Sequence, residues 1–134
     1  MPYLIDSDIL IDHFANLKEA TRLLEHLAIE GIAISIITYM ETFQGVLRSP
    51  HPESTQTIFQ EFFQTVPILP FSLTTAERCA RLRETLKKEG KRVKARALDL
   101  ITAATALEYD FTLVTRNRED YKDIPHLKLY ESMQ

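Results

Sequence analysis

The sequence predicts an α/β fold, a three-layer α/β/α sandwich built around a mainly parallel five-stranded sheet. Short apolar runs rich in β-branched residues alternate along the chain with longer segments whose apolar residues recur at helical spacing. Strands separated by helices are joined by right-handed crossovers, which make neighbouring strands parallel and place helices on both faces of the sheet. A length of 134 residues is typical of one domain, so we expect a single domain over residues 1–134.

The first third of the chain predicts two strands and two helices. The apolar run 3–5 ends at an aspartate and predicts the first strand, and residues 9–14 predict a short helix. Leucines and alanines recur every three or four residues over 17–28, which predicts a longer helix that ends at Gly31. Residues 32–36 are compact and mostly β-branched, and they predict the second strand.

Two helices and a third strand follow. Thr38 with Glu41 three residues later has the spacing of a capping box, so we expect a helix from there to about residue 48. Pro52 begins the next helix, which has one face of apolar residues, namely Ile58, Phe59, Phe62 and Phe63. Residues 66–71 predict a third strand, and its two prolines place that strand at an edge of the sheet or make it irregular.

The last part of the chain predicts two further helices, a short helix and two strands. Thr74 or Thr75 caps an amphipathic helix that Gly90 ends, and small residues line a helix over 98–109. The remaining predicted elements are a strand at 112–114, a short helix at 118–121 and a fifth strand at 127–130.

Composition excludes several classes of protein. The content of 45% hydrophobic and 26% charged residues excludes a disordered chain and a collagen-like repeat. The lone Cys79 cannot form an internal disulfide, and it occupies an apolar helical position, so we expect it in the core of a cytoplasmic protein. The amino-terminal residues lack a basic leader, and no apolar run is long enough to span a membrane.

The net charge of −3 conceals a strong asymmetry. Residues 78–96 hold nine basic residues and two acidic ones, a charge of 9 − 2 = +7, while the rest of the chain carries 7 − 17 = −10. A solvated helix face explains such a run without any partner. A guide for phosphate groups explains it as well, and both interpretations stay open at this stage.

Acidic residues follow the predicted strands. Asp6 and Asp8 follow the first strand, Glu41 lies about one helical turn after the second, and Asp99 lies near the start of the helix before the fourth strand; behind that strand come Asn117, Glu119 and Asp120. Because carboxyl ends of parallel strands meet at one edge of the sheet, we expect these side chains to converge. Clustered carboxylates repel one another unless a hard divalent cation such as Mg²⁺ binds them.

Each acid also has a purely structural explanation. Asp6 fits the capping position of the helix that follows it, and Glu41 fits the second half of a capping box. Asp99 fits the acid that the helix dipole favours in a first turn, and Asp120 fits a turn. The convergence of all four favours a metal site.

Four segments, residues 3–12, 34–41, 98–106 and 113–121, resemble the signature blocks of PIN-domain proteins, and most of all those of VapC-type toxins of toxin–antitoxin pairs. The blocks stand in the family's order and span nearly the whole chain. The resemblance implies a PIN-like fold and an Mg²⁺- or Mn²⁺-dependent endoribonuclease that hydrolyses RNA phosphodiester bonds with a metal-activated water. It also implies a cognate VapB-like antitoxin and a homodimer, with Phe43 and the aromatic residues of 59–63 either at such an interface or in the core.

By position, the resemblance assigns metal binding and catalysis to Asp6, Glu41 and Asp99. Many relatives have a fourth acid where this chain has Asn117, and others have it at the position of Asp120, so we expect Asp120 to complete the site with help from Asn117. The supporting residues are Ser7, whose hydroxyl would orient Asp6, together with Asp8, Thr115 and Asn117. The expected RNA contacts are Arg116, Lys87, Lys88, Lys91, Arg92, Lys94 and Arg96. Asp110 stands where relatives often have glycine, so we expect a left-handed backbone there.

Two other functions remain open from the residues alone. The run 4–9 also resembles the first motif of haloacid-dehalogenase-type phosphatases, with Asp6 as nucleophile, although the late acidic motif of that family is missing. A non-catalytic RNA-binding domain of the same fold is the second alternative. No Gly-rich phosphate loop or metal-binding histidine spacing is present in the sequence.

Overall fold

The computed structural model describes residues 2–131, and its centre is a parallel sheet of four strands. The strands are β1 (Tyr3–Ile5), β2 (Ile32–Ser35), β3 (Ile68–Leu69) and β4 (Thr112–Val114). Their order in the sheet is β3-β2-β1-β4, and each neighbouring pair is parallel. The carboxyl ends of β1 and β4 therefore meet at one edge, and Leu4 pairs with both Ala33 and Leu113.

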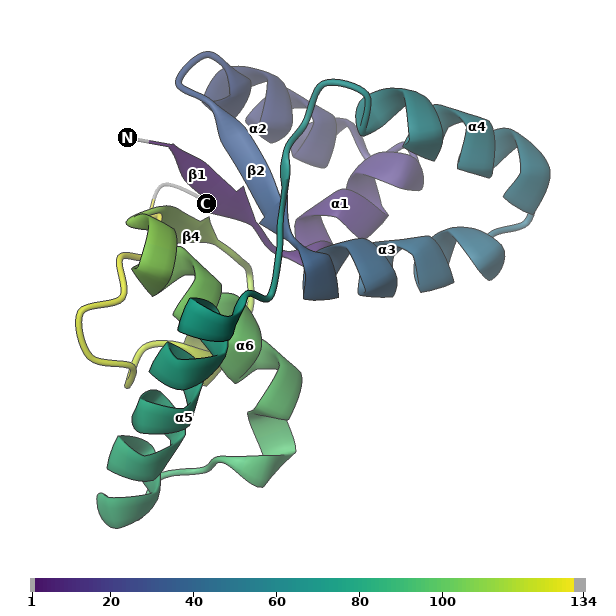
Figure 1. Cartoon of the computed structure of the whole chain (residues 1–134). Coiled ribbons are helices and arrows are strands. Elements are labelled where there is room, and N and C mark those ends of the chain that lie inside the picture. The colour runs from purple at the N-terminus through teal and green to yellow at the C-terminus, as the bar shows by residue number, and fades with distance from the viewer. Residues whose placement is uncertain (1, 132–134) are drawn as a thin grey trace.

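Six α-helices and two short 3₁₀ turns surround the sheet (Figure 1). The helices within the described residues are α1 (Ser7–Phe14), α2 (Lys18–Ala28), α3 (Ile36–Leu47), α4 (Pro52–Phe62), α5 (Leu73–Lys88) and α6 (Ala97–Tyr109). The 3₁₀ turns are η1 (Lys94–Arg96) and η2 (Arg118–Asp120). In Figure 1, α5 and α6 lie together on one side of the strands, and α1, α3 and α4 lie together on the other side.

Two hydrophobic clusters form the core, one on each face of the sheet. Successive residues of a strand point to opposite faces, so Leu4 and Leu113 pack against α5 and α6, whereas Ile5 and Val114 pack against α1 and α2. The predicted three-layer α/β/α sandwich is therefore confirmed. Aromatic rings of α1, α3 and α4 also contact one another, so the aromatic residues of α4 and Phe43 pack mainly inside the molecule.

The predicted fifth strand is reduced to one bridge. Residues 127–130 run beside β4, but only Leu129 pairs with Leu113 within the described chain. The Leu113 N–H donates to the Lys128 carbonyl at 2.8 Å, and the Tyr130 N–H donates to the Leu113 carbonyl at 2.9 Å. The prediction of five strands was wrong in this detail, because residues 127–130 make only this single bridge to β4 within the described chain.

Two helices are capped by a different residue from the one predicted. Ser35 caps α3, with its hydroxyl oxygen accepting the Thr38 N–H at 3.1 Å, so the capping box that Thr38 and Glu41 suggested does not form. Ser72 caps α5 in the same way, in place of Thr74 or Thr75. In both cases a serine just upstream offers an equivalent oxygen acceptor, and the helix gains part of a turn.

Two predictions about special backbone positions are confirmed. Asp110 ends α6 in the left-handed conformation, with φ +56°, and its short polar side chain tolerates this conformation. The two-residue strand β3 lies at an edge of the sheet between Pro67 and Pro70, as the prolines predicted. Within residues 2–131, no helix combines the length and apolar content that crossing a membrane requires.

Candidate active site

Asp6 lies at the point where β1 ends and α1 begins, and it is the most enclosed of the predicted acids. Its side chain is only 7% exposed. One carboxylate oxygen accepts the Ser7 N–H at 2.8 Å, and the other accepts the Thr115 hydroxyl at 2.8 Å. Burial, and next the charge of Asp8, raise the pKa of Asp6 above its usual value. Asp6 is thus both the helix cap that one interpretation expected and a member of the acidic cluster.

Glu41 reaches the same place from α3. Burial raises the pKa of Glu41, and the charges of Asp6, Asp99 and Asp8 add to this, while a hydrogen bond from Ser7 opposes it. Because α3 begins at Ile36, the glutamate lies beyond the first turn and is free of any capping role. The Ser7 hydroxyl therefore serves Glu41, and the expectation that it orients Asp6 was wrong, because Ser7 holds Asp6 through its backbone N–H.

Asp99 enters the cluster from the first turn of α6. Burial raises the pKa of the Asp99 carboxyl, and the charges of Asp6 and Asp120 contribute, against a hydrogen bond that lowers it. That hydrogen bond comes from the Tyr121 hydroxyl, 3.1 Å from Asp99 Oδ1. The charge of Asp6 acts on Asp99, and both charges act on Glu41, so these three acids from separate segments lie near one another, as the sequence predicted.

The fourth acid lies at the margin of this cluster. Asp120 follows β4 on η2, and its carboxylate accepts a hydrogen bond from Arg92 Nη2 at 2.9 Å. Its charge still acts on Asp99. Asn117 is exposed, and its backbone N–H donates to the Thr115 hydroxyl oxygen at 3.0 Å. The choice between Asp120 and Asn117 as the completing ligand stays a prediction, and proximity to Asp99 favours Asp120.

The predicted supporting residues connect α1 with the loop after β4. Thr115 is 1% exposed and donates to Asp6, so its hydroxyl faces the cluster rather than a substrate phosphate. Asp8 accepts the Arg116 N–H at 3.0 Å, and the Arg116 guanidinium pairs with Asp12. These contacts attach the loop after β4 to α1 and to its capping residue Asp6.

Sequence reasoning missed Tyr121. Its side chain is 1% exposed, and its hydroxyl lies 3.2 Å from Asp6 Oδ2 as well as 3.1 Å from Asp99 Oδ1. Burial, followed by the charges of Asp6 and Asp99, raises the pKa of Tyr121 strongly. The signal available in the sequence was an aromatic residue with a polar end directly after Asp120, to which the sequence analysis gave no role.

The basic segment borders the acids, but one of its residues is structural. Arg96 was predicted to contact RNA, and this was wrong: its side chain is buried, with two bonds to the Asp123 carboxylate at 2.6 and 2.8 Å and one to the Asp120 carbonyl at 2.9 Å. The other predicted RNA contacts of the segment are exposed, namely Lys87, Lys88, Lys91, Arg92 and Lys94. The bond from Arg92 to Asp120 brings this exposed charge to the edge of the cluster.

The donor set fits a hard divalent cation. Carboxylate oxygens are the ligands that Mg²⁺ and Mn²⁺ prefer. Such an ion would neutralise the negative charge that, after burial, contributes to the raised pKa values of Asp6, Glu41 and Asp99. Within residues 2–131, the structure shows no group of three or more acidic, histidine or cysteine side chains arranged so that it could hold a metal ion. The Tyr121 hydroxyl lies between two of the carboxylates in this arrangement.

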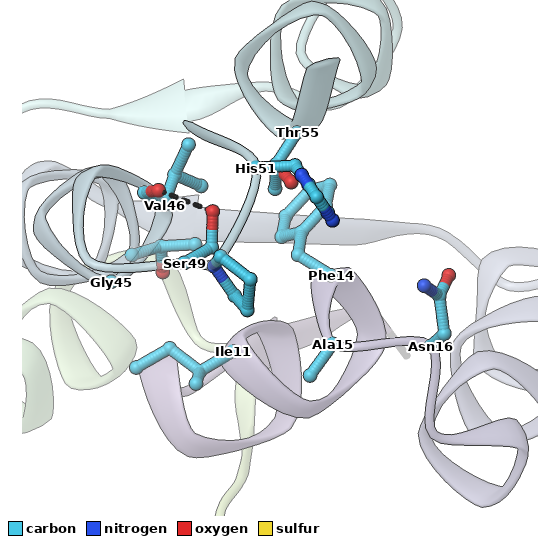
Figure 2. Close-up of a pocket in the computed structure, with 11 residues that line it drawn as sticks. Ile11, Phe14, Ala15, Asn16, Gly45, Val46, Ser49, His51 and Thr55 are labelled. Carbon is cyan, nitrogen blue, oxygen red and sulfur yellow. Dashed lines mark hydrogen bonds between the residues drawn. The ribbon is translucent and has the colours of Figure 1, made fainter. Parts of the chain in front are cut away.

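A separate pocket of about 390 Å³ opens at the other end of α1. Ile11 and Phe14 of α1, with Gly45 and Val46 of α3, form much of its apolar wall, while Ser49 and His51 lie at the loop before α4 (Figure 2). Thr42 also lines it, and its fully buried hydroxyl has no hydrogen-bond partner in the described part of the chain. None of the four predicted metal-binding acids lines this pocket.

Comparisons with known proteins agree with the predicted fold. The sequence model of the PIN domain matches residues 3–127. The ribonuclease VapC2 of Rickettsia felis is 34% identical over 98 residues, 73% of this chain and 72% of that protein. The tRNA(fMet)-specific endonuclease VapC of Shigella flexneri is 23% identical over 128 residues, 96% of each protein.

A solved structure shows the same fold. The crystal structure of VapBC2 from Rickettsia felis bound to a promoter DNA fragment superposes with a TM-score of 0.84 and 30% identity, covering 97% of this chain and 98% of that one. The chain therefore belongs to the PIN-domain family and is one of its VapC-type members. These matches give no support to the phosphatase interpretation of the run 4–9.

Proposed function

We propose that this protein is a metal-dependent endoribonuclease and the toxin of a toxin–antitoxin pair. The observation that carries the proposal is the meeting of Asp6, Glu41 and Asp99 at the carboxyl end of the sheet. The Tyr121 hydroxyl lies within hydrogen-bond distance of both Asp6 and Asp99, and after burial the charges of these two acids raise the pKa of Glu41. Two VapC relatives are named as a ribonuclease and an endonuclease, which supports RNA as the substrate. A scaffold domain has no evident need for three converging carboxylates, so the catalytic function is favoured.

Asp6, Glu41 and Asp99 would hold the Mg²⁺ or Mn²⁺ ion, with Asp120 assisting. When bound, such an ion supplies a water of lowered pKa and neutralises charge on the phosphodiester. Ser7 holds the Glu41 carboxylate, and Thr115 holds that of Asp6, so hydrogen bonds within the chain orient both. Asp8 keeps the loop after β4 close to α1 through the Arg116 backbone.

The exposed basic residues would position RNA without reading its sequence. Lys87 and Lys88 end α5, while Arg92 and Lys94 lie between α5 and α6, next to the acids through the Arg92–Asp120 bond. Contacts to phosphate fix the register of a nucleic acid and weaken as salt rises. RNA binding by this protein should therefore fall steeply with salt concentration.

The pocket at the end of α1 is our candidate docking place for the antitoxin. The similar solved structure from Rickettsia felis is of VapBC2, which supports a VapB-like partner for this chain. An apolar side chain would fill the space between Phe14 and Val46, and a polar atom beside it would satisfy the Thr42 hydroxyl. The cytoplasm, where both RNA and antitoxin are present, is the proposed location.

We also propose a homodimer. Helix α3 exposes Ile36, Met40 and Leu47, which are 41%, 49% and 54% exposed and are spaced four and seven residues apart on one side of the helix. Such a stripe suits pairing with a second copy. Light scattering on the wild type and on Met40→Lys measures the oligomeric state. A wild-type monomer at working concentrations would contradict the proposed homodimer.

The direct test is cleavage of RNA with Mg²⁺, with Mn²⁺ and with EDTA. We expect cleavage with either metal, none with EDTA, and none in Asp99→Asn with metal present. Cleavage that persists in EDTA would contradict the metal dependence. A trapped aspartyl-phosphate on Asp6 would instead revive the phosphatase alternative.

A further inference from the structure

The Tyr121 hydroxyl is enclosed between two acids that come from different elements. It lies 3.2 Å from Asp6 Oδ2, at the start of α1, and 3.1 Å from Asp99 Oδ1, in the first turn of α6. The ring belongs to the hydrophobic cluster that Leu100 and Ala103 also form, so packing fixes where the hydroxyl stands. The oxygen is thus held by the core and not by the acids.

The two acids depend on this hydroxyl to different degrees. Asp6 also accepts the Ser7 N–H and the Thr115 hydroxyl, so three donors define its orientation. For Asp99, within residues 2–131, Tyr121 is the hydrogen-bond donor that the structure shows. Asp99 is only half-buried at the beginning of a helix, where its side chain has other rotamers available.

We propose that Tyr121 is a positioning residue: its hydroxyl fixes the orientation of Asp99 relative to Asp6, so that both carboxylates are ready for a divalent ion. This inference rests on the proposed function, in which Asp6 and Asp99 hold the ion. A phenol has a single hydrogen to donate, so one hydroxyl serves the two carboxylates in turn and keeps both close to it. Groups that orient metal ligands in this way commonly contribute 10- to 100-fold, roughly, to metal affinity.

The test is Tyr121→Phe, which keeps the ring and removes only the oxygen. Calorimetric titration of the purified, metal-free full chain with Mn²⁺ is expected to show binding about 10-fold weaker or more. Tyr3→Phe is the matched control, because Tyr3 also donates its hydroxyl to a carboxylate, that of Glu30 at 3.2 Å, away from the acids. Its Mn²⁺ affinity should equal that of the wild type.

A double-mutant cycle with Asp99→Asn separates positioning from packing. If Tyr121 acts through Asp99, removing the hydroxyl from Asp99→Asn should cost far less affinity than removing it from the wild type. Equal losses in both backgrounds would overturn the inference, as would wild-type affinity in Tyr121→Phe. A wild type that binds no Mn²⁺ would instead overturn the proposed metal site itself, so the two failures are distinct.

Discussion

The two ends of helix α1 lie in surroundings of opposite chemistry. Its first turn follows the Asp6 cap and lies among carboxylates and hydroxyls, while its last turn contributes Ile11 and Phe14 to an apolar pocket (Figure 2). At the polar end, donors within the chain orient Asp6, and its negative charge lies close to those of other acids. At the apolar end, unfilled volume and the partnerless Thr42 hydroxyl remain. One end therefore suits an ion, and the other suits a partner.

The shortness of α1 joins these two places. Eight residues at 1.5 Å each span roughly 12 Å, so the acids and the pocket are separated by about that length. An extended peptide covers roughly 12 Å with about four residues. A single segment of an antitoxin seated in the pocket would therefore be long enough to reach the acids, and this links the proposed recognition to the proposed control of activity.

The largest expected effect is at the polar end. Asp6→Asn keeps the capping oxygen of α1 but removes one negative charge from the centre of the cluster, so we expect RNA cleavage to fall by at least ~100-fold. The measurement is a time course of cleavage with Mg²⁺. Asp110→Asn is the matched control, because asparagine also tolerates the left-handed backbone there and the site is elsewhere. Undiminished cleavage by Asp6→Asn would remove the basis for a catalytic end of α1.

Ionic hydrogen bonds from Arg96 stabilise the segment next to the polar end of α1, and removing them should lower the stability of the protein. Arg96→Met removes three bonds that hold Asp123 and the Asp120 carbonyl, so we expect the free energy of unfolding to fall by about 2–3 kcal/mol. Urea denaturation measures it. Lys94→Met loses the same charge from an exposed neighbouring residue and should change stability by less than about 0.5 kcal/mol. Equal losses in both variants would show that Arg96 acts only through its charge.

The apolar end should respond in binding and not in catalysis. Ala15 lines the pocket at the end of α1, and Ala15→Leu would occupy part of its volume, so we expect antitoxin affinity to fall about 10-fold, or about 1.4 kcal/mol. Calorimetry with the purified antitoxin measures this, and RNA cleavage without antitoxin should stay unchanged. Ala28→Leu, at an exposed position on α2, is the control. A loss of cleavage in Ala15→Leu would show that the two ends are not separate.

Sequence reasoning succeeded where one local signal determines the outcome. Alternating apolar runs are enough to predict the parallel strands, and parallel strands alone bring Asp6 and Asp99 to one edge of the sheet. The left-handed backbone at Asp110 follows from the end of a helix meeting a short polar side chain. The first outcome depends only on the pattern of strands along the chain, and the second depends on a few neighbouring residues.

Sequence reasoning failed where a contact between distant segments of the chain determines the role of a side chain. Arg96 has the pattern of an exposed basic residue, and only the approach of Asp123 makes its burial favourable. The Tyr121 hydroxyl belongs to the site because α1 and α6 converge on it, which no local pattern contains. The pocket likewise exists only between helices, so neither its volume nor the isolated Thr42 hydroxyl was predictable.

His13 provides a test, with a small expected effect, of the difference between the two ends of α1. It lies in the last turn of α1, its ring contacts Phe14 and Phe62, and its Nδ1 is 2.8 Å from the Thr21 hydroxyl on α2. Burial lowers the pKa of His13 below its usual value, and the charge of Glu25 on α2 partly opposes this. Burial raises the pKa of Asp6 and Glu41 at the other end, so the charged form is disfavoured at both ends: the carboxylate at one and the imidazolium at the other.

The sign of the pH effect follows from that shift. As the pH falls below about 6.5, the unfolded chain takes up the His13 proton more readily than the folded one, so the stability that His13 contributes above this pH is progressively lost. His13→Gln should therefore show a smaller drop in Tm than the wild type between about pH 7.5 and about pH 5.5. His26→Gln, on the exposed side of α2, should follow the wild type. Parallel Tm curves for the wild type and His13→Gln would mean that the apolar end accepts a charge as readily as water does, and the contrast between the two ends of α1 would then rest on the acids alone.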